Sequence, residues 1–155
     1  MVKVKFDTME ISCNHDAAEY LCCLCESALR AISDSGSDSQ YRKCDNFIKA
    51  IYSAIDADIV KISYEEYRDL LIAMHIYSDY QHFNSSSEEC ANSIIYLLWN
   101  GVHNRKTKEI IFCGDDFANI IRLLRYVYES ENFEYHHMAS SRVVADFYEK
   151  YKAAL

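Results

Sequence analysis

Residues 63–71 read Ser-Tyr-Glu-Glu-Tyr-Arg-Asp-Leu-Leu, and residues 113–121 read Cys-Gly-Asp-Asp-Phe-Ala-Asn-Ile-Ile. The two stretches are 50 residues apart and share an acidic pair, an aromatic residue and an aliphatic pair at matching positions. The match extends outward at the same spacing, where Met74 aligns with Leu124 and Phe83 with Phe133. A repeat of this length indicates one supersecondary unit that is copied along the chain.

A weaker third copy begins near Asn14, at an offset of 49 residues from Ser63. Its positions that match the second copy are Asp16, Leu21 and Cys25. The three repeats span residues 9–57, 58–103 and 108–155. One unit cannot cover its own apolar face, so we expect the copies to share one core. The sequence therefore predicts a helix-dominated α+β fold of three β-α-α repeats, with about six helices around a small sheet of short strands.

The composition favours the same fold. The chain has 155 residues, half of them apolar, with three glycines and no proline. A chain with so few turn-forming residues is expected to be mostly helical. Its length is that of a single domain, which we place at residues 1–155.

Period-2 alternation predicts where the strands lie. Apolar residues alternate with lysines near the start of the chain, at residues 2–6, and residues 9–12 form a second short run. These two runs are expected to form a hairpin around residues 7–8. Two further strands are predicted at residues 59–62 and 109–113.

Capping residues predict where helices begin. Asn14 is a candidate N-cap for a helix over residues 16–32, and the polar residues 33–39 are the expected loop after it. Ser63 and Glu66 fit a capping box, in which each side chain accepts a hydrogen bond from the other residue's backbone.

The charge balance restricts the classes of partner. Acidic residues outnumber basic ones by 24 to 16, which gives a net charge of −8. Nonspecific nucleic-acid binding requires Lys and Arg to neutralise phosphates. The balance therefore argues against direct nucleic-acid binding, although a local basic patch stays open. An acidic surface favours a basic protein partner, while plain solubility is the alternative explanation.

The cysteines indicate a reducing compartment. There are seven of them, an odd number, and most lie inside apolar helical patterns. We expect no disulfide framework, no secretory signal and no membrane span, and hence a cytoplasmic protein. For a phage protein this compartment would be the cytoplasm of the host cell.

Two groups of residues are candidates for metal or redox sites. Cys22 and Cys25 have the spacing of a C-x-x-C motif, but no further ligands follow nearby, so packing in the core is the better explanation. His136 and His137 lie among carboxylates, and a metal-assisted hydrolase using them is one alternative function. No catalytic motif stands out elsewhere. We expect a protein that is not an enzyme and binds no cofactor and no metal.

A second alternative comes from a resemblance. The segment Ile110-Ile111-Phe112-Cys113-Gly114-Asp115-Asp116-Phe117 resembles the short helical death motif of apoptosis regulators, which centres on Gly-Asp-Asp or Gly-Asp-Glu between apolar positions. The resemblance covers eight residues and implies a virus-encoded helical apoptosis regulator. A simple strand-to-helix junction also explains the segment.

The prediction of a partner-binding surface depends on two stretches without Lys or Arg. They run between Arg68 and Arg105 and between Arg125 and Arg142, at corresponding places in two repeats. Tyrosines at positions 77, 80, 126, 128 and 135 lie in or beside these stretches. Tyrosine beside carboxylates suits an Arg- or Lys-rich partner, and half-buried packing is the other explanation. The predicted contact residues are Asp79, Tyr80, Glu88, Glu89, Glu129, Glu131, Glu134 and Tyr135.

The leading functional prediction follows from these features. We expect a non-catalytic acidic protein that binds and occludes a basic nucleic-acid-handling protein, such as a nuclease. Anti-CRISPR, anti-restriction and toxin-immunity proteins are similar in size and charge. In this mechanism the carboxylates occupy the positions of substrate phosphates.

Overall fold

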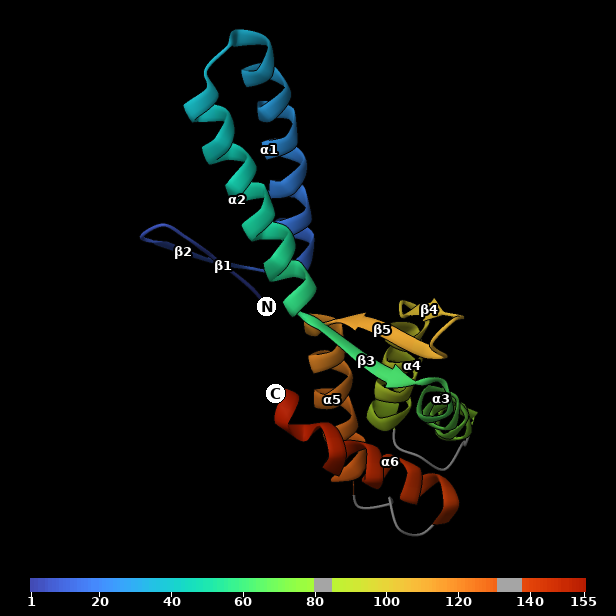
Figure 1. Cartoon of the computed structure of the whole chain (residues 1–155). Coiled ribbons are helices and arrows are strands. Elements are labelled where there is room, and N and C mark those ends of the chain that lie inside the picture. The colour runs from blue at the N-terminus through green and yellow to red at the C-terminus, as the bar shows by residue number, and fades with distance from the viewer. Residues whose placement is uncertain (80–84, 131–137) are drawn as a thin grey trace. The chain divides into compact units, whose positions relative to one another are not determined.

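The computed structural model describes residues 1–79, 85–130 and 138–155. Within them it has six α-helices, five short strands and a final 3₁₀ turn (Figure 1). This confirms the predicted helix-dominated α+β class. The chain divides into two compact units, one formed by residues 1–59 with 113–115 and the other by residues 60–112 with 116–155. The prediction of a single domain stays a prediction, since a compact unit need not fold alone.

The first unit begins with the predicted hairpin. Strands β1 (Val2–Phe6) and β2 (Met9–Cys13) pair antiparallel, with Val4 opposite Ile11. The turn needs no glycine because Asp7 takes the left-handed conformation, at φ 55°, which aspartate tolerates better than most residues.

Two long helices complete the first unit. The helix α1 (His15–Ser35) begins as predicted, because Asn14 Oδ1 accepts from the Ala17 N–H at 2.8 Å. Gly36 ends it at φ 86°, and its N–H donates to the Ile32 carbonyl at 3.1 Å. The predicted loop over residues 33–39 was too long. The glycine cap lets α1 reach Ser35, and α2 (Asp38–Ala57) starts two residues after the cap.

A three-stranded sheet lies at the start of the second unit. Its order is β3 (Ile59–Ser63), β5 (Glu109–Cys113) and β4 (Val102–Asn104), with β5 in the centre. Strands β4 and β5 form an antiparallel hairpin. Strands β3 and β5 also run in opposite directions (Figure 1). Strand β4 was not predicted, because it has only three residues and two of them are polar.

Four helices complete the second unit. They are α3 (Tyr64–Asp79), α4 (Ser85–Trp99), α5 (Gly114–Tyr128) and α6 (Met138–Tyr151), and α6 leads into the 3₁₀ turn η1 (Lys152–Ala154). The predicted capping box at the start of α3 is confirmed. Ser63 Oγ accepts from the Glu66 N–H at 3.1 Å, and Glu66 Oε2 accepts from the Ser63 N–H at 3.2 Å.

The 50-residue repeat is visible in the structure. Strand β3 leads directly into α3, and β5 leads directly into α5 at the same spacing. Burial repeats as well, and the pairs that are buried in both copies are Ile62 with Phe112, Tyr67 with Phe117, Leu70 with Ile120, Met74 with Leu124 and Tyr77 with Val127. The aligned residues Phe83 and Phe133 lie outside the described residues.

The buried side chains form two clusters and not the one shared core that the repeats predicted. The first unit buries Val2, Val4, Ala18, Cys22, Ile48 and Ile51. The second unit buries a larger cluster around the repeated positions given above. The apolar stripe of a helix shows which face is buried but not which element covers it. In the described part of the chain, no helix is long and apolar enough to cross a bilayer.

Candidate functional site

Three of the predicted contact residues lie at one end of the α3–α4 helix pair. Asp79 is the last residue of α3, and Glu88 and Glu89 lie near the start of α4. The Ser78 hydroxyl lies 2.5 Å from Asn92 Oδ1, which places the end of α3 beside the middle of α4. Asn92 is only one helical turn beyond Glu88. We call Asp79, Glu88 and Glu89 the acidic end.

The charges of the acidic end are open to a partner. All three side chains are exposed. None of them forms an ion pair with any other residue that the structure describes. A basic protein that approached this end would therefore not have to displace an internal cation first.

Helix stability accounts for one of these carboxylates but not for all of them. Glu88 is in the first turn of α4, where the helix dipole favours a negative charge. Asp79 is at the opposite pole of α3, where the dipole disfavours a negative charge, and the last turn of α3 has no basic residue. The position of Asp79 thus opposes local stability, which is common for residues that serve a binding function.

Glu129 occupies the equivalent place one repeat later but is not free. It follows the last residue of α5, as Asp79 ends α3. Its Oε1 lies 3.0 Å from Nε of Arg125, one turn earlier on α5. Both side chains are more than half exposed, so water screens the pair. Glu129 must nevertheless break its ion pair with Arg125 before it can contact a partner.

The other predicted contact residues divide into two groups. Tyr80, Glu131, Glu134 and Tyr135 lie outside the described residues and stay predictions. Tyr77, which flanks the first basic-free stretch, is buried in the core and its hydroxyl lies 3.2 Å from Ser141 Oγ. It cannot supply interface area, so the packing explanation is the correct one there. Tyr128 is half-buried against Tyr148, and Tyr126 is exposed.

Cys22 and Cys25 are placed as packing residues. All seven are free thiols, and Cys22 is buried in the core of the first unit. Burial raises the pKa of the Cys22 thiol, and burial together with the neighbouring Cys44 raises that of Cys25. Raised pKa values keep these thiols protonated, whereas metal binding and redox chemistry require thiolates. His136 and His137 lie outside the described residues, and within those residues no group of three ligands could hold a metal ion.

The segment that resembles a death motif crosses a strand-to-helix junction. Its first four residues belong to β5 and its last four begin α5. The glycine of the motif has a packing role, because a Cβ on Gly114 would lie 2.5 Å from Asp58 Oδ1. Gly114 N–H also donates to the Asp58 carbonyl at 2.7 Å. The segment is not one continuous helix, so this geometry does not support the apoptosis alternative, which stays a prediction.

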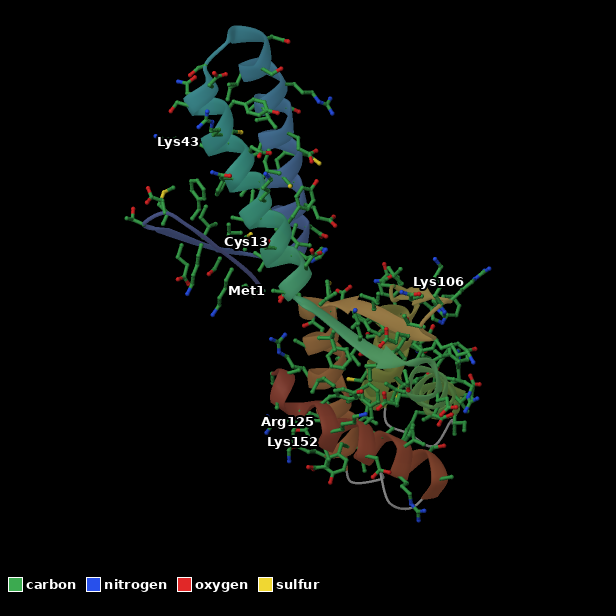
Figure 2. All side chains as sticks on the ribbon, viewed as in Figure 1. Met1, Cys13, Lys43, Lys106, Arg125 and Lys152 are labelled. Carbon is green, nitrogen blue, oxygen red and sulfur yellow. The ribbon has the colours of Figure 1, made fainter. Side chains whose placement is uncertain are left out.

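The contact residues predicted from the sequence do not include the turn between β4 and β5. Arg105, Lys106 and Lys108 lie there within four residues. Figure 2 shows Lys106 at the outer end of this hairpin. The sequence indicates this cluster of cations, because the cluster directly follows the stretch after Arg68 that has no Lys or Arg.

No family model, no curated protein and no solved structure matches this chain.

Proposed function

We propose that this chain is a non-catalytic inhibitor that binds a basic, nucleic-acid-handling protein through the acidic end of the α3–α4 pair. The observation that carries the proposal is the placement of Asp79, Glu88 and Glu89. They are exposed, without internal cations among the described residues, and brought together by the contact between Ser78 and Asn92.

The mechanism is occlusion. A nucleic-acid-binding protein presents Lys and Arg side chains spaced for phosphates. Carboxylates held at a helix-pair end offer those cations an alternative set of oxygen acceptors, and charge-assisted hydrogen bonds are among the stronger polar contacts. The overall charge of −8 adds long-range attraction, which speeds the encounter with a basic surface.

Charge reversal tests the proposal. The chain carrying Asp79→Lys, Glu88→Lys and Glu89→Lys is compared with the wild type as bait in lysate from the source organism and its host. We expect the wild type to capture a basic nucleic-acid-binding protein that added double-stranded DNA elutes. The triple variant should lose this capture, and its association rate with the purified partner should fall roughly tenfold or more at low salt.

A matched control separates local contacts from total charge. Asp34, Asp38 and Asp56 are also exposed and form no ion pair within the described residues, and they lie on the helices of the first unit. Reversing these three changes the net charge by the same amount. The control variant should keep most of the capture. Equal capture by both variants and the wild type, or a captured protein that DNA does not elute, would contradict the occlusion mechanism.

A further inference from the structure

A pocket of about 190 Å³ lies beside the β4–β5 turn in the second unit. Cationic and aromatic side chains together line it, and the ones that matter here are Tyr64, His103, Asn104, Arg105, Lys108 and Glu109. Pockets that enclose a whole ligand are usually larger than roughly 300 Å³. This one can hold only part of a ligand, such as the base of a nucleotide, with the rest outside it.

The cations of the turn are available to an anion. The turn holds Arg105, Lys106 and Lys108, although the chain as a whole has a net charge of −8. None of the three forms an ion pair with another residue of the described ranges. Arg105 and Lys108 border the pocket, and because its lining is almost entirely apolar, they line it mainly with their aliphatic stems.

The turn is held in place by its own hydrogen bonds. Asn104 Oδ1 accepts from the backbone N–H groups of Lys106 and Thr107, at 3.1 Å and 3.3 Å. The carbonyl of Lys108 accepts from the Tyr64 N–H at 2.9 Å, which ties the turn to the start of α3. A phosphate-binding pair on such a turn is positioned before the ligand arrives.

Lys108 itself has an unusual backbone. Its φ is 53°, in the left-handed region, where glycine or asparagine is more stable than a long side chain. Backbone strain of this kind is common at functional sites and persists where the surrounding structure holds it in place. Structural needs alone would favour Gly or Asn at this position.

Two aromatic rings also line the pocket. Tyr64 is 45% exposed, and its ring centroid lies 6.3 Å from that of His103. His103 is exposed and meets the buried Tyr67 edge-on, with 5.2 Å between the ring centroids. Aromatic faces beside cations are the combination that binds a nucleotide, since the base stacks and the phosphate pairs with the cations.

We propose that this pocket binds a nucleotide, with the base stacked on Tyr64, the tilted His103 ring against its edge, and the phosphate held outside the pocket by Arg105 and Lys108. Among the described residues that line the pocket, Glu109 is the only carboxylate, and its charge repels a phosphate. Glu109 then accepts a hydrogen bond from an exocyclic amine of the base. The expectation of no direct nucleic-acid binding rested on total charge, which does not describe this local site.

The ligand can come from two sources, and two probes distinguish them. Adenosine 5′-monophosphate represents a free nucleotide, and a fluorescein-labelled deoxyadenylate hexamer represents a single strand. Binding of the full chain to each is measured by calorimetry and by anisotropy at 50 mM salt. Binding of the monophosphate alone indicates a free nucleotide, and binding of the hexamer alone or of both indicates a single strand. Each of these results supports the proposal.

The variant Lys108→Asn tests the geometry without endangering the fold. Asparagine tolerates the left-handed backbone, so the melting temperature should be unchanged or higher, while affinity for the bound probe should fall at least tenfold. The control Lys43→Asn removes the same charge from an exposed position on α2 and should keep the affinity.

Three results would overturn the proposal. One is failure of both probes to bind the wild type at millimolar concentration. Another is equal competition by inorganic phosphate together with no effect of Tyr64→Leu, which would mean a plain anion contact. The third is an equal loss of affinity in Lys108→Asn and Lys43→Asn. This test does not depend on the acidic end, so its failure leaves the proposed inhibitor function untouched.

Discussion

The Tyr151 hydroxyl lies 3.0 Å and 2.9 Å from the two carboxylate oxygens of Glu66, a residue 85 positions earlier in the chain. Glu66 also completes the capping box of α3 and forms an ion pair with Lys150. One carboxylate thus joins the first turn of α3 to the end of α6. The two ends of the second unit's sequence are held together by this contact.

Removing the Tyr151 hydroxyl should destabilise the protein. The variant Tyr151→Phe loses the hydrogen bond that its single O–H shares between the two carboxylate oxygens of Glu66, but it keeps the ring, which packs against Phe117 and Phe147. We expect the free energy of unfolding to fall by about 1–2 kcal/mol, because hydrogen bonds to charged groups exceed neutral ones in strength. Urea denaturation measures this. Tyr20→Phe is the control, since Tyr20 is 67% exposed, and a loss of the same size there would contradict the role of Tyr151.

The same carboxylate should make the protein sensitive to acid. Burial alone would raise the pKa of Glu66, but hydrogen bonds from Lys150, Ser63 and Tyr151 hold it below its ordinary value of 4.5. A lowered pKa in the folded state stabilises the protein above pH 4.5, and this stabilisation is lost as the pH falls through the folded value. In Glu66→Gln the unfolding free energy should therefore decline less between pH 5 and pH 3 than in the wild type. Parallel pH profiles for the two proteins would contradict this.

Gly101 should not accept a side chain. A Cβ at this buried position would lie 2.5 Å from Ile110 Cγ2 and 2.7 Å from two ring carbons of Phe112. Overpacking of this kind costs about 1–3 kcal/mol, so Gly101→Ala should lower the urea midpoint by a corresponding amount. Gly36→Asn is the comparison, because Gly36 has φ 86° and open space around it. Asparagine tolerates that backbone and should cost no more than about 1 kcal/mol. A larger loss at position 36 than at position 101 would be the contrary result.

Neighbouring cysteines should differ in reactivity. Cys23 is exposed, whereas Cys22 is buried and burial raises the pKa of its thiol. Alkylation depends on access and on the thiolate fraction. Iodoacetamide at pH 8 should label Cys23 in the native protein, while Cys22 should react only after denaturant is added. Mass spectrometry of the digested chain distinguishes the two sites, and labelling of Cys22 at the rate of Cys23 would mean that the first unit opens readily.

The features that the sequence predicted well are set by local interactions. The Asn14 cap, the Ser63–Glu66 box and the hairpin around residues 7–8 each depend on residues within a few positions of one another. The 50-residue repeat was also readable, because equivalent positions face the core in both copies. Local rules of this kind apply before any tertiary contact forms.

The features that were missed depend on distant contacts or on very short elements. Two hydrophobic clusters appear where one was expected, because periodicity identifies a buried face without its partner. Strand β4 has three residues, too few for a period-2 pattern. The ion pair between Arg125 and Glu129 was predictable, since residues four apart on a helix face each other. The absence of Lys and Arg after Arg125 indicates free carboxylates, but Arg125 itself lies within reach of Glu129.

Asp79 and Glu88 should respond oppositely when their charge is reversed. Lysine at position 79 suits the C-terminal pole of α3, so Asp79→Lys should raise the free energy of unfolding by about 0.3–1 kcal/mol. Lysine at position 88 opposes the N-terminal pole of α4, so Glu88→Lys should lower it by a similar amount.

Both reversals should weaken capture of the basic partner, because both remove a carboxylate from the acidic end. Urea denaturation at low salt gives the two signs, and 1 M salt should shrink both effects. A partner-binding role for Asp79 predicts that the more stable variant binds less well. Stability and binding that rise together at position 79 would mean that Asp79 is not a contact residue.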